Sequence, residues 1–369
     1  MTDPRSLPPF ASDNYAPVHP EVLAAVAAAN DGYAVAYGDD PWTARLDARV
    51  REEFGAGALA FPVLNGTGAN VVSLTALSPR WGGVVVSDVA HVNTDENGAP
   101  ERVGSLKLLA CRSTDGRITP DDVARWAGQR DDVHRAHPAV LSLTQSTELG
   151  TVYPLEELRA LTHVAHDLGM AVHVDGSRLA NAAASLGCSL RALTTDAGVD
   201  VVSLGAAKNG GMLGEAVLVL GPDDAPDVAS ARAREAASAA IPFLRKATMQ
   251  LASKTRFVSA QLLALLGEPG DAGPLWHRNA AQANAMAARL RDGLKDLAPA
   301  VRVTRPTEAN AVFATMPRAA ADRLRAVARF YDWADGEAPD RVEVRLMCAW
   351  DTSPETVDAF VAAAADALS

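Results

Sequence analysis

The stretch VDVVSLGAAKNGG at residues 199–211 decides how the rest of the chain is interpreted. It begins as an apolar run of strand type and ends in small residues, a lysine, an asparagine and two glycines. Lysine is among the side chains least often buried, so Lys208 is unusual at the mouth of a buried strand. Small, apolar surroundings would disfavour its ammonium form and make the amine nucleophilic. The simpler interpretation is that Lys208 extends its charge into water.

Short apolar runs alternate with helical stretches on both sides of this segment. Near-continuous Val, Leu and Ala runs separated by helices indicate an α/β fold with a large, mostly parallel sheet covered on both faces. Ligands of such sheets bind beyond the carboxyl ends of the strands, where Lys208 would lie. Seven runs are expected to be strands, at residues 58–64, 82–88, 105–111, 139–145, 170–176, 199–205 and 215–221.

The chain divides into three expected segments. Residues 1–20 predict an extended arm, and residues 21–266 a large α/β domain. A turn-rich break, GEPGDAGP, then introduces a smaller α+β domain over residues 267–369, with strand signals in VRVT, NAVFATM and VEVRLMCA.

Composition limits the possible functions. The chain has 369 residues, 48% of them hydrophobic, and a formal net charge of −11. An acidic balance argues against nucleic acid or an anionic membrane as a partner. The three cysteines are odd in number and lack metal-type spacing, which favours reduced thiols in the cytoplasm. No apolar run has the length of a membrane span, and the N-terminus does not resemble a signal peptide.

A second feature is HVDGSR at residues 173–178, where an apolar strand ends in Asp175. A carboxylate there could pair with a protonated ring nitrogen, whereas the alternative is a helix cap near Ser177. Asp175 precedes Lys208 by one helix-length crossover (208 − 175 = 33 residues). Neighbouring strands would therefore bring both side chains to one crevice.

A third feature is NGTGAN at residues 65–70, between an expected strand and an expected helix. Its glycines allow the backbone to approach an anion, and the helix N-terminus adds free N–H groups. It matches neither a nucleotide P-loop nor G-x-G-x-x-G, and an ordinary helix cap is the alternative. Beside a lysine and an aspartate, the phosphate of a pyridine aldehyde would be its natural ligand.

Six segments, in order, resemble the low-specificity L-threonine aldolases, which are pyridoxal-phosphate enzymes with the aspartate aminotransferase fold (fold type I). The resemblance runs from about residue 12 to the C-terminal helix. It implies a carbon–carbon lyase, or aldehyde-lyase, that cleaves L-threonine, L-allo-threonine or a relative such as phenylserine to glycine and an aldehyde. The segments are SDNYAPVHPEV, YGDDPWTARL, FPVLNGTGAN, HVDGSRLANAA, SLGAAKNGG and VEVRLMCAWDTS.

The resemblance implies a role for each matching residue around pyridoxal 5'-phosphate. Lys208 would bind the cofactor covalently, and Asp175 would pair with its ring nitrogen. His91 would stack on the ring, with Glu96 nearby. The phosphate would be held by Gly66, Thr67 and Gly68.

For the substrate, the resemblance implies that Arg178 lies near the cofactor hydroxyl and the substrate carboxylate. Arg345 would grip that carboxylate, helped by Ser12. Tyr37 lies in the segment that approaches the neighbouring subunit's site in this family. Lys246 and Lys254 would reach a neighbour's phosphate. A homo-oligomer with shared sites, a dimer or tetramer, is therefore expected.

One departure concerns the base for the substrate β-hydroxyl. Many family members carry Asn-Thr-His after the strand that here reads AVLSLTQSTELG, and Gln145 or Ser146 occupies the place of that histidine. The base is left open between His91, a bound water and the cofactor phosphate. A second departure is Ala-Lys-Asn around Lys208, where many relatives have Ser-Lys-Gly.

Two alternatives stay open at this point, and a third is not expected. Another activity with the same cofactor, such as an aminotransferase, β-eliminating lyase or racemase, would change the bond that breaks. A non-catalytic cofactor-binding scaffold is the second. The third is a metal site at His163, His166 and His173; we expect none, because two lie on a helix, one lies on a strand, and no cysteine joins them.

Overall fold

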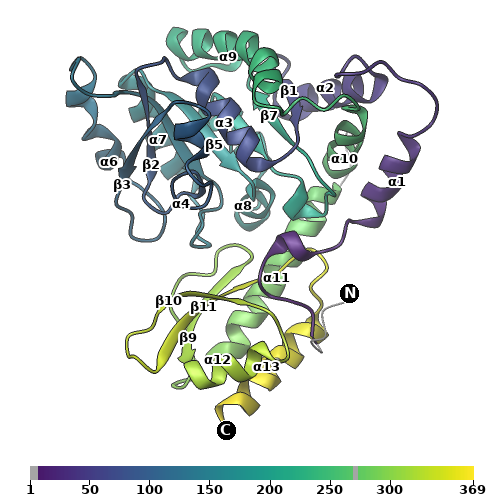
Figure 1. The fold of residues 1–369 in the computed structure, drawn as a ribbon, viewed down its shortest axis with the longest axis vertical. Helices are drawn as coiled ribbons and strands as arrows, with labels where there is room; N and C mark the ends of the chain where they lie inside the picture. Colours follow the sequence, from purple (N-terminus) through teal and green to yellow (C-terminus); the bar gives the residue numbers. More distant parts are fainter. Residues whose placement is uncertain (1–6, 269–272) are drawn as a thin grey trace.

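The computed structural model describes residues 7–268 and 273–369. The start of the expected arm and part of the turn-rich break lie outside the described residues. None of the helices in the described ranges is long and apolar enough to cross a membrane. Figure 1 shows a large sheet with its helices above a smaller unit that contains the C-terminus.

The large sheet has seven strands in the order β1-β7-β6-β5-β4-β2-β3. Strand β7 runs antiparallel to both of its neighbours, and the remaining pairs are parallel. All seven expected strands are present, and the predicted α/β class is confirmed. The bounds are β1 Leu59–Val63, β2 Gly82–Ser87, β3 Lys107–Cys111, β4 His137–Thr144, β5 Ala171–Gly176, β6 Val201–Leu204 and β7 Glu215–Val219.

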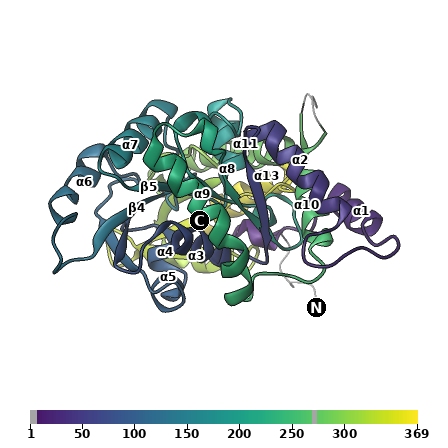
Figure 2. The same cartoon turned by 90° about the horizontal axis from the view of Figure 1, so that it is seen from above.

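Alternate side chains of the central strands pack on opposite layers of helices, because successive residues of a strand face opposite sides of the sheet. Val201 and Val217 join the apolar core under α3 and α9, whereas Val202 and Leu218 join the larger core on the other face. Figure 2 shows α6 and α7 at one end of the molecule and α1 and α2 at the other. The covering helices are α1 Pro20–Ala28, α2 Pro41–Phe54, α3 Gly66–Leu77, α6 Pro120–Ala124, α7 Leu155–Asp167, α8 Leu179–Leu186, α9 Val228–Ala247 and α10 Arg256–Leu266.

A second sheet has four strands in the order β10-β11-β9-β8. Strand β10 was not predicted, because YDWAD is a polar, largely exposed edge strand without apolar alternation. The strands β8 Arg302–Val303, β9 Ala311–Pro317, β10 Tyr331–Asp335 and β11 Arg341–Met347 pack with α11 Leu275–Lys295, α12 Arg318–Arg325 and α13 Pro354–Leu368.

The N-terminal arm packs against the unit built on this second sheet. The N–H of Phe10 donates to the carbonyl of Arg329, and the N–H of Met347 donates to the carbonyl of Phe10. The Phe10 ring is fully buried in the same apolar core as Phe360 of α13. These contacts lead the chain into the short 3-10 helix η1 (Asp13–Tyr15), beside the candidate site. The domain boundary at residue 267 stays a prediction.

Candidate active site

Lys208 lies in the short 3-10 helix η4 (Ala207–Asn209), just after strand β6. It is half-buried and lines two cavities, of about 340 and 320 Å³. We name the first the loop cavity, because residues 65–67 line it, and the second the arginine cavity, because Arg178 and Arg345 line it. His91 and Asn14 also line both, so the two cavities adjoin around Lys208.

Glu215, the first residue of β7, lines the loop cavity and supports the segment that carries Lys208. Its carboxylate accepts a hydrogen bond from the backbone N–H of Ala206. Burial raises the pKa of Glu215 to about 7, although the Ala206 N–H and the charge of Lys208 act in the opposite direction. The sequence reasoning missed this residue; an acidic residue opening the apolar run EAVLVLG was the available signal.

Asp175 lies near the end of β5, which is the neighbour of β6 in the sheet, so its strand and that of Lys208 end at the same edge. Its side chain is almost fully buried. Burial opposes ionisation, but the charge of Lys208 and two hydrogen bonds from Ser177 outweigh it and hold the pKa of Asp175 below its usual value. The carboxylate is therefore ionised and available to a cationic ring nitrogen.

Asn70, on helix α3, links Asp175 to the pair formed by His91 and Glu96. Its Nδ2 atom donates to Asp175 Oδ2 at 3.0 Å and to Glu96 Oε1 at 2.9 Å. One amide group therefore lies between two buried carboxylates, and each carboxylate accepts a hydrogen bond from its NH₂ group. The sequence reasoning quoted Asn70 inside the NGTGAN motif but gave it no role.

His91 opens helix α4 (His91–Thr94) and shares Oε1 of Glu96 with Asn70. The distance from His91 Nδ1 to Glu96 Oε1 is 3.0 Å, and Nδ1 must donate because a carboxylate only accepts. This hydrogen bond raises the pKa of His91 above its ordinary value, although burial acts in the opposite direction. Oε2 of Glu96 and Oδ1 of Asn70 are buried without a hydrogen-bond partner in the described part of the chain.

The loop before α3 presents two free backbone donors to the loop cavity. Asn65 caps the helix by accepting a hydrogen bond from the N–H of Gly68 at 2.7 Å. Within the described residues, the N–H groups of Gly66 and Thr67 donate no hydrogen bond, as is usual in the first turn of a helix. They are therefore available to bind an anion. The N–H of Gly68 is less suited to the predicted phosphate contact, because it already donates to Asn65 Oδ1. A Cβ at Gly68 would overlap the Gln250 side chain, at 2.1 Å.

Arg178 and Arg345 line the arginine cavity together with Ser12. Arg178 is held by two hydrogen bonds to Asp13, a buried residue of the arm that the sequence reasoning did not select. The Arg345 guanidinium lies 5.1 Å from the centre of the Trp333 ring, and its Nε atom is buried without a partner among the described residues. Burial and the charge of Arg178 lower the pKa of Arg345. Two guanidinium groups at one cavity have the chemistry to bind a carboxylate.

The two residues suggested for the place of the family histidine do not line either cavity. The Gln145 side chain is buried and bonds to both backbone groups of Tyr153. Ser146 is also buried, and its hydroxyl oxygen has no hydrogen-bond partner within residues 7–268 and 273–369. Further along the same loop, Glu148 enters the arginine cavity instead.

Three residues assigned by the resemblance to shared sites lie outside both cavities of the described chain. Tyr37 is half exposed, and the Lys246 ammonium lies 5.0 Å from the centre of its ring. Lys254 lines a separate apolar groove of about 520 Å³ between α1 and α10, together with Leu23 and Phe257.

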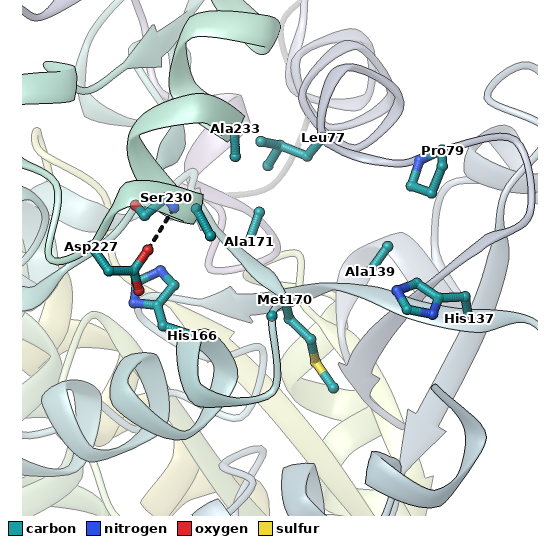
Figure 3. Close-up of a pocket in the computed structure, with 12 residues that line it drawn as sticks. Leu77, Pro79, His137, Ala139, His166, Met170, Ala171, Asp227, Ser230 and Ala233 are labelled. Carbon is teal, nitrogen blue, oxygen red and sulfur yellow. Dashed lines mark hydrogen bonds between the residues drawn. The ribbon is translucent and has the colours of Figure 1, made fainter. Parts of the chain in front are cut away.

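A further pocket, of about 150 Å³, lies between α7, α9 and the sheet and contains none of the expected site residues. Figure 3 shows His166, Asp227 and Ser230 around it. His166 donates to Asp200, whose carboxylate also pairs with the buried Arg234, so this region is a structural charge network. In the described ranges, no group of three or more His, Cys, Asp or Glu side chains is arranged to hold a metal ion.

A solved structure of threonine aldolase from Leishmania major has a TM-score of 0.88 and 23% identity, and the match covers 98% of this chain and 99% of that one. The fold is therefore that of the fold-type-I α/β enzymes. Low-specificity L-threonine aldolases from Pseudomonas aeruginosa and from a second Pseudomonas strain are 42% and 40% identical, each over 94% of both chains.

The beta-eliminating lyase model matches residues 9–318. The chain belongs to the beta-eliminating lyase family, and the low-specificity L-threonine aldolases are its relatives within it. This confirms the resemblance found in the sequence.

Proposed function

We propose that this chain is a pyridoxal-phosphate-dependent aldehyde-lyase that cleaves L-threonine, L-allo-threonine or related β-hydroxy-α-amino acids to glycine and an aldehyde. The proposal rests on one observation above all. Lys208 faces a junction where a cavity with free anion-binding N–H groups adjoins a cavity with two guanidinium groups. A phosphate and a carboxylate could thus bind on opposite sides of one amine.

The residues present fit the cofactor. A Cβ built on Gly66 would find its nearest neighbour, the Ser177 hydroxyl, only at 3.8 Å, so the glycine leaves open space in front of the free N–H groups. Asp175, ionised and buried, suits a protonated pyridine nitrogen. Glu96 and Asn70 each have a buried oxygen at this site that has no hydrogen-bond partner among the residues the structure describes.

Each residue has a role that follows from its position. Bound pyridoxal phosphate supplies an electron-accepting ring conjugated to the amino group that it carries. Lys208 provides the amine that holds the cofactor, and Asp175 keeps a proton at the ring nitrogen. Arg178 and Arg345 orient the substrate carboxylate, and this orientation determines which bond to Cα breaks. His91, which lines both cavities, would contact the ring.

We further propose that the working protein is a homo-oligomer, a dimer or tetramer with shared sites. The resemblance assigns Tyr37, Lys246 and Lys254 to a neighbour's site, and in the described chain they lie outside the loop and arginine cavities. The apolar groove between α1 and α10 would lie against a second copy. A cytoplasmic location stays a proposal that rests on three cysteines without disulfides.

The decisive experiment is an assay of purified protein, with and without added pyridoxal phosphate, on a panel of β-hydroxy-α-amino acids. We expect glycine and an aldehyde in equal amounts. Formation of a keto acid from an amino donor, or racemisation of alanine without aldehyde, would replace the proposal with another activity of the same cofactor. No product, despite a visible absorption band of bound cofactor, would support a non-catalytic cofactor-binding scaffold. Sedimentation at several protein concentrations determines the oligomeric state.

A further inference from the structure

Glu148 is a buried carboxylate that accepts no hydrogen bond within residues 7–268 and 273–369. Its side chain is only 8% exposed, and its nearest cation is Arg178, whose Nη1 lies 4.0 Å from Oε1. A buried charge without donors is costly, so such groups are rare unless a ligand supplies the donor. Arg178 gives two of its five N–H donors to Asp13, and its Nη1 lies too far from Glu148 to donate a hydrogen bond.

Hydrogen bonds within the loop around Glu148 fix the position of this residue. The N–H of Gly150 donates to the carbonyl of Thr147 at 3.0 Å and closes a tight turn with Glu148 inside it. The hydroxyl groups of Thr147 and Thr151 are 2.7 Å apart, and Gly150 has a φ of 77°, which favours glycine. A carboxylate on such a turn is preorganised toward whatever enters the arginine cavity.

The other candidates for a base in this cavity are less suitable. His91 already donates its Nδ1 proton to Glu96, and the proposed function places its ring against the cofactor rather than at the substrate hydroxyl. Lys208 is the residue proposed to bind the cofactor covalently. The substrate carboxylate binds the arginines, and the group of a β-hydroxy-α-amino acid that remains free to donate is its β-hydroxyl.

Building on the proposed function, we propose that Glu148 is the catalytic base that accepts the proton of the substrate β-hydroxyl. The O–H bond breaks and its proton passes to a Glu148 oxygen. The electron pair of that bond becomes the second carbon–oxygen bond of the aldehyde. The Cα–Cβ bond breaks, and its pair stays on the glycine fragment, whose Cα later takes up one proton. The proton lost from oxygen thus balances the proton gained by carbon.

The test compares Glu148→Gln with wild-type protein in two reactions of the holoenzyme. Cleavage of L-threonine requires loss of the β-hydroxyl proton, so we expect a 10²- to 10⁴-fold fall, the usual contribution of a general base. Exchange of the glycine Cα proton with D₂O involves no hydroxyl group, so we expect a rate within threefold of wild type. Titration of the apo-protein with pyridoxal phosphate should give the wild-type absorption band and affinity, which shows that the variant is folded.

Two further variants sharpen the test. Glu148→Asp keeps a carboxylate on a shorter side chain and should recover at least tenfold of the cleavage rate lost in the glutamine variant. Glu157→Gln makes the same change at an exposed carboxylate of α7, paired with Arg117, and should behave as wild type.

Two results would overturn the inference. Cleavage by Glu148→Gln within threefold of wild type would show that Glu148 accepts no proton. An equal loss of cleavage and of glycine exchange would show that it acts only by setting the charge around the arginines. By contrast, wild-type protein that releases no aldehyde would refute the proposed function itself, so the two failures are distinct.

Discussion

Arg178 donates two hydrogen bonds to Asp13, from Nε to Oδ2 at 2.7 Å and from Nη2 to Oδ1 at 3.0 Å. Both side chains are buried, and 165 residues separate them in the sequence. The pair fastens the N-terminal arm to the segment that follows β5 and leaves Nη1 of Arg178 on the side of the arginine cavity. The arm is therefore part of the site's construction, although it contributes few of the groups that face the cavity.

Asp13→Ala should weaken binding of the substrate carboxylate, because Arg178 loses the partner that fixes its orientation. We expect the KM for L-threonine to rise at least tenfold, which corresponds to about 1.4 kcal/mol. The free energy of unfolding should also fall by about 3 kcal/mol, since one partner of a buried ion pair is left alone. Steady-state kinetics and urea unfolding measure the two effects. An unchanged KM would show that Arg178 is positioned by other contacts; Asp223→Ala, at an exposed site, is the control.

Lys208→Ala should abolish both the visible absorption band of the cofactor and cleavage activity, because no other lysine lines either cavity in the described part of the chain. Lys208→Arg keeps the positive charge beside Asp175 but cannot form the covalent bond. It should therefore also lack the band while retaining the stability of the wild type. A visible band in either variant would mean that a different amine binds the cofactor.

Asn70→Leu should weaken the binding of pyridoxal phosphate by the apo-protein by about 10- to 100-fold, because hydrogen bonds to two charged groups are lost. Glu96 and Asp175 would then face each other without the shared amide. Ser73→Ala is the matched control: it removes a buried polar group from the same helix, bonded to Ser203 and outside this network. Equal affinity in the leucine variant and the control would remove Asn70 from the site.

Glu96→Gln should lower the pKa of His91. The Glu96 hydrogen bond is the largest cause that holds this pKa above its ordinary value of 6.5, and burial acts in the opposite direction. A raised pKa means that this interaction stabilises the fold fully below pH 6.5 and that the contribution is lost as the pH rises through the folded-state pKa. An NMR titration of His91 in the wild type and in the variant measures the shift. Identical titration curves would contradict the assignment.

Acid should destabilise the protein between pH 6.5 and pH 4, partly through His173. Burial lowers the pKa of His173 to about 4, and its two nitrogens bond to Ser142 and Ser203. In this window the unfolded chain binds a proton that the folded chain excludes, so stability falls as the pH falls. The single-group contribution is up to about 3 kcal/mol. Thermal melting across this window should show a shallower pH dependence in His173→Gln; an equal slope would assign the effect to other groups.

The sequence was sufficient for the elements with strong periodicity. The seven strands of the large sheet have near-continuous apolar runs, because helices cover both faces of the sheet. Strand β10 was not predicted, because an exposed edge strand needs no apolar pattern and YDWAD has none. Lys208 and Asp175 were selected because each is a charged residue at the end of an apolar strand, where burial is costly. Arg345 was selected only through the family resemblance.

By itself, then, the sequence determined the order of the strands along the chain, the residues at their ends and the family. Only the tertiary structure revealed that Asn70 bridges two carboxylates, that Asp13 holds Arg178, and that Glu148 rather than Gln145 enters the arginine cavity. The reason is physical: burial leaves a local apolar pattern in the sequence, whereas a hydrogen bond between distant segments depends on side-chain directions that exist only after the chain has folded.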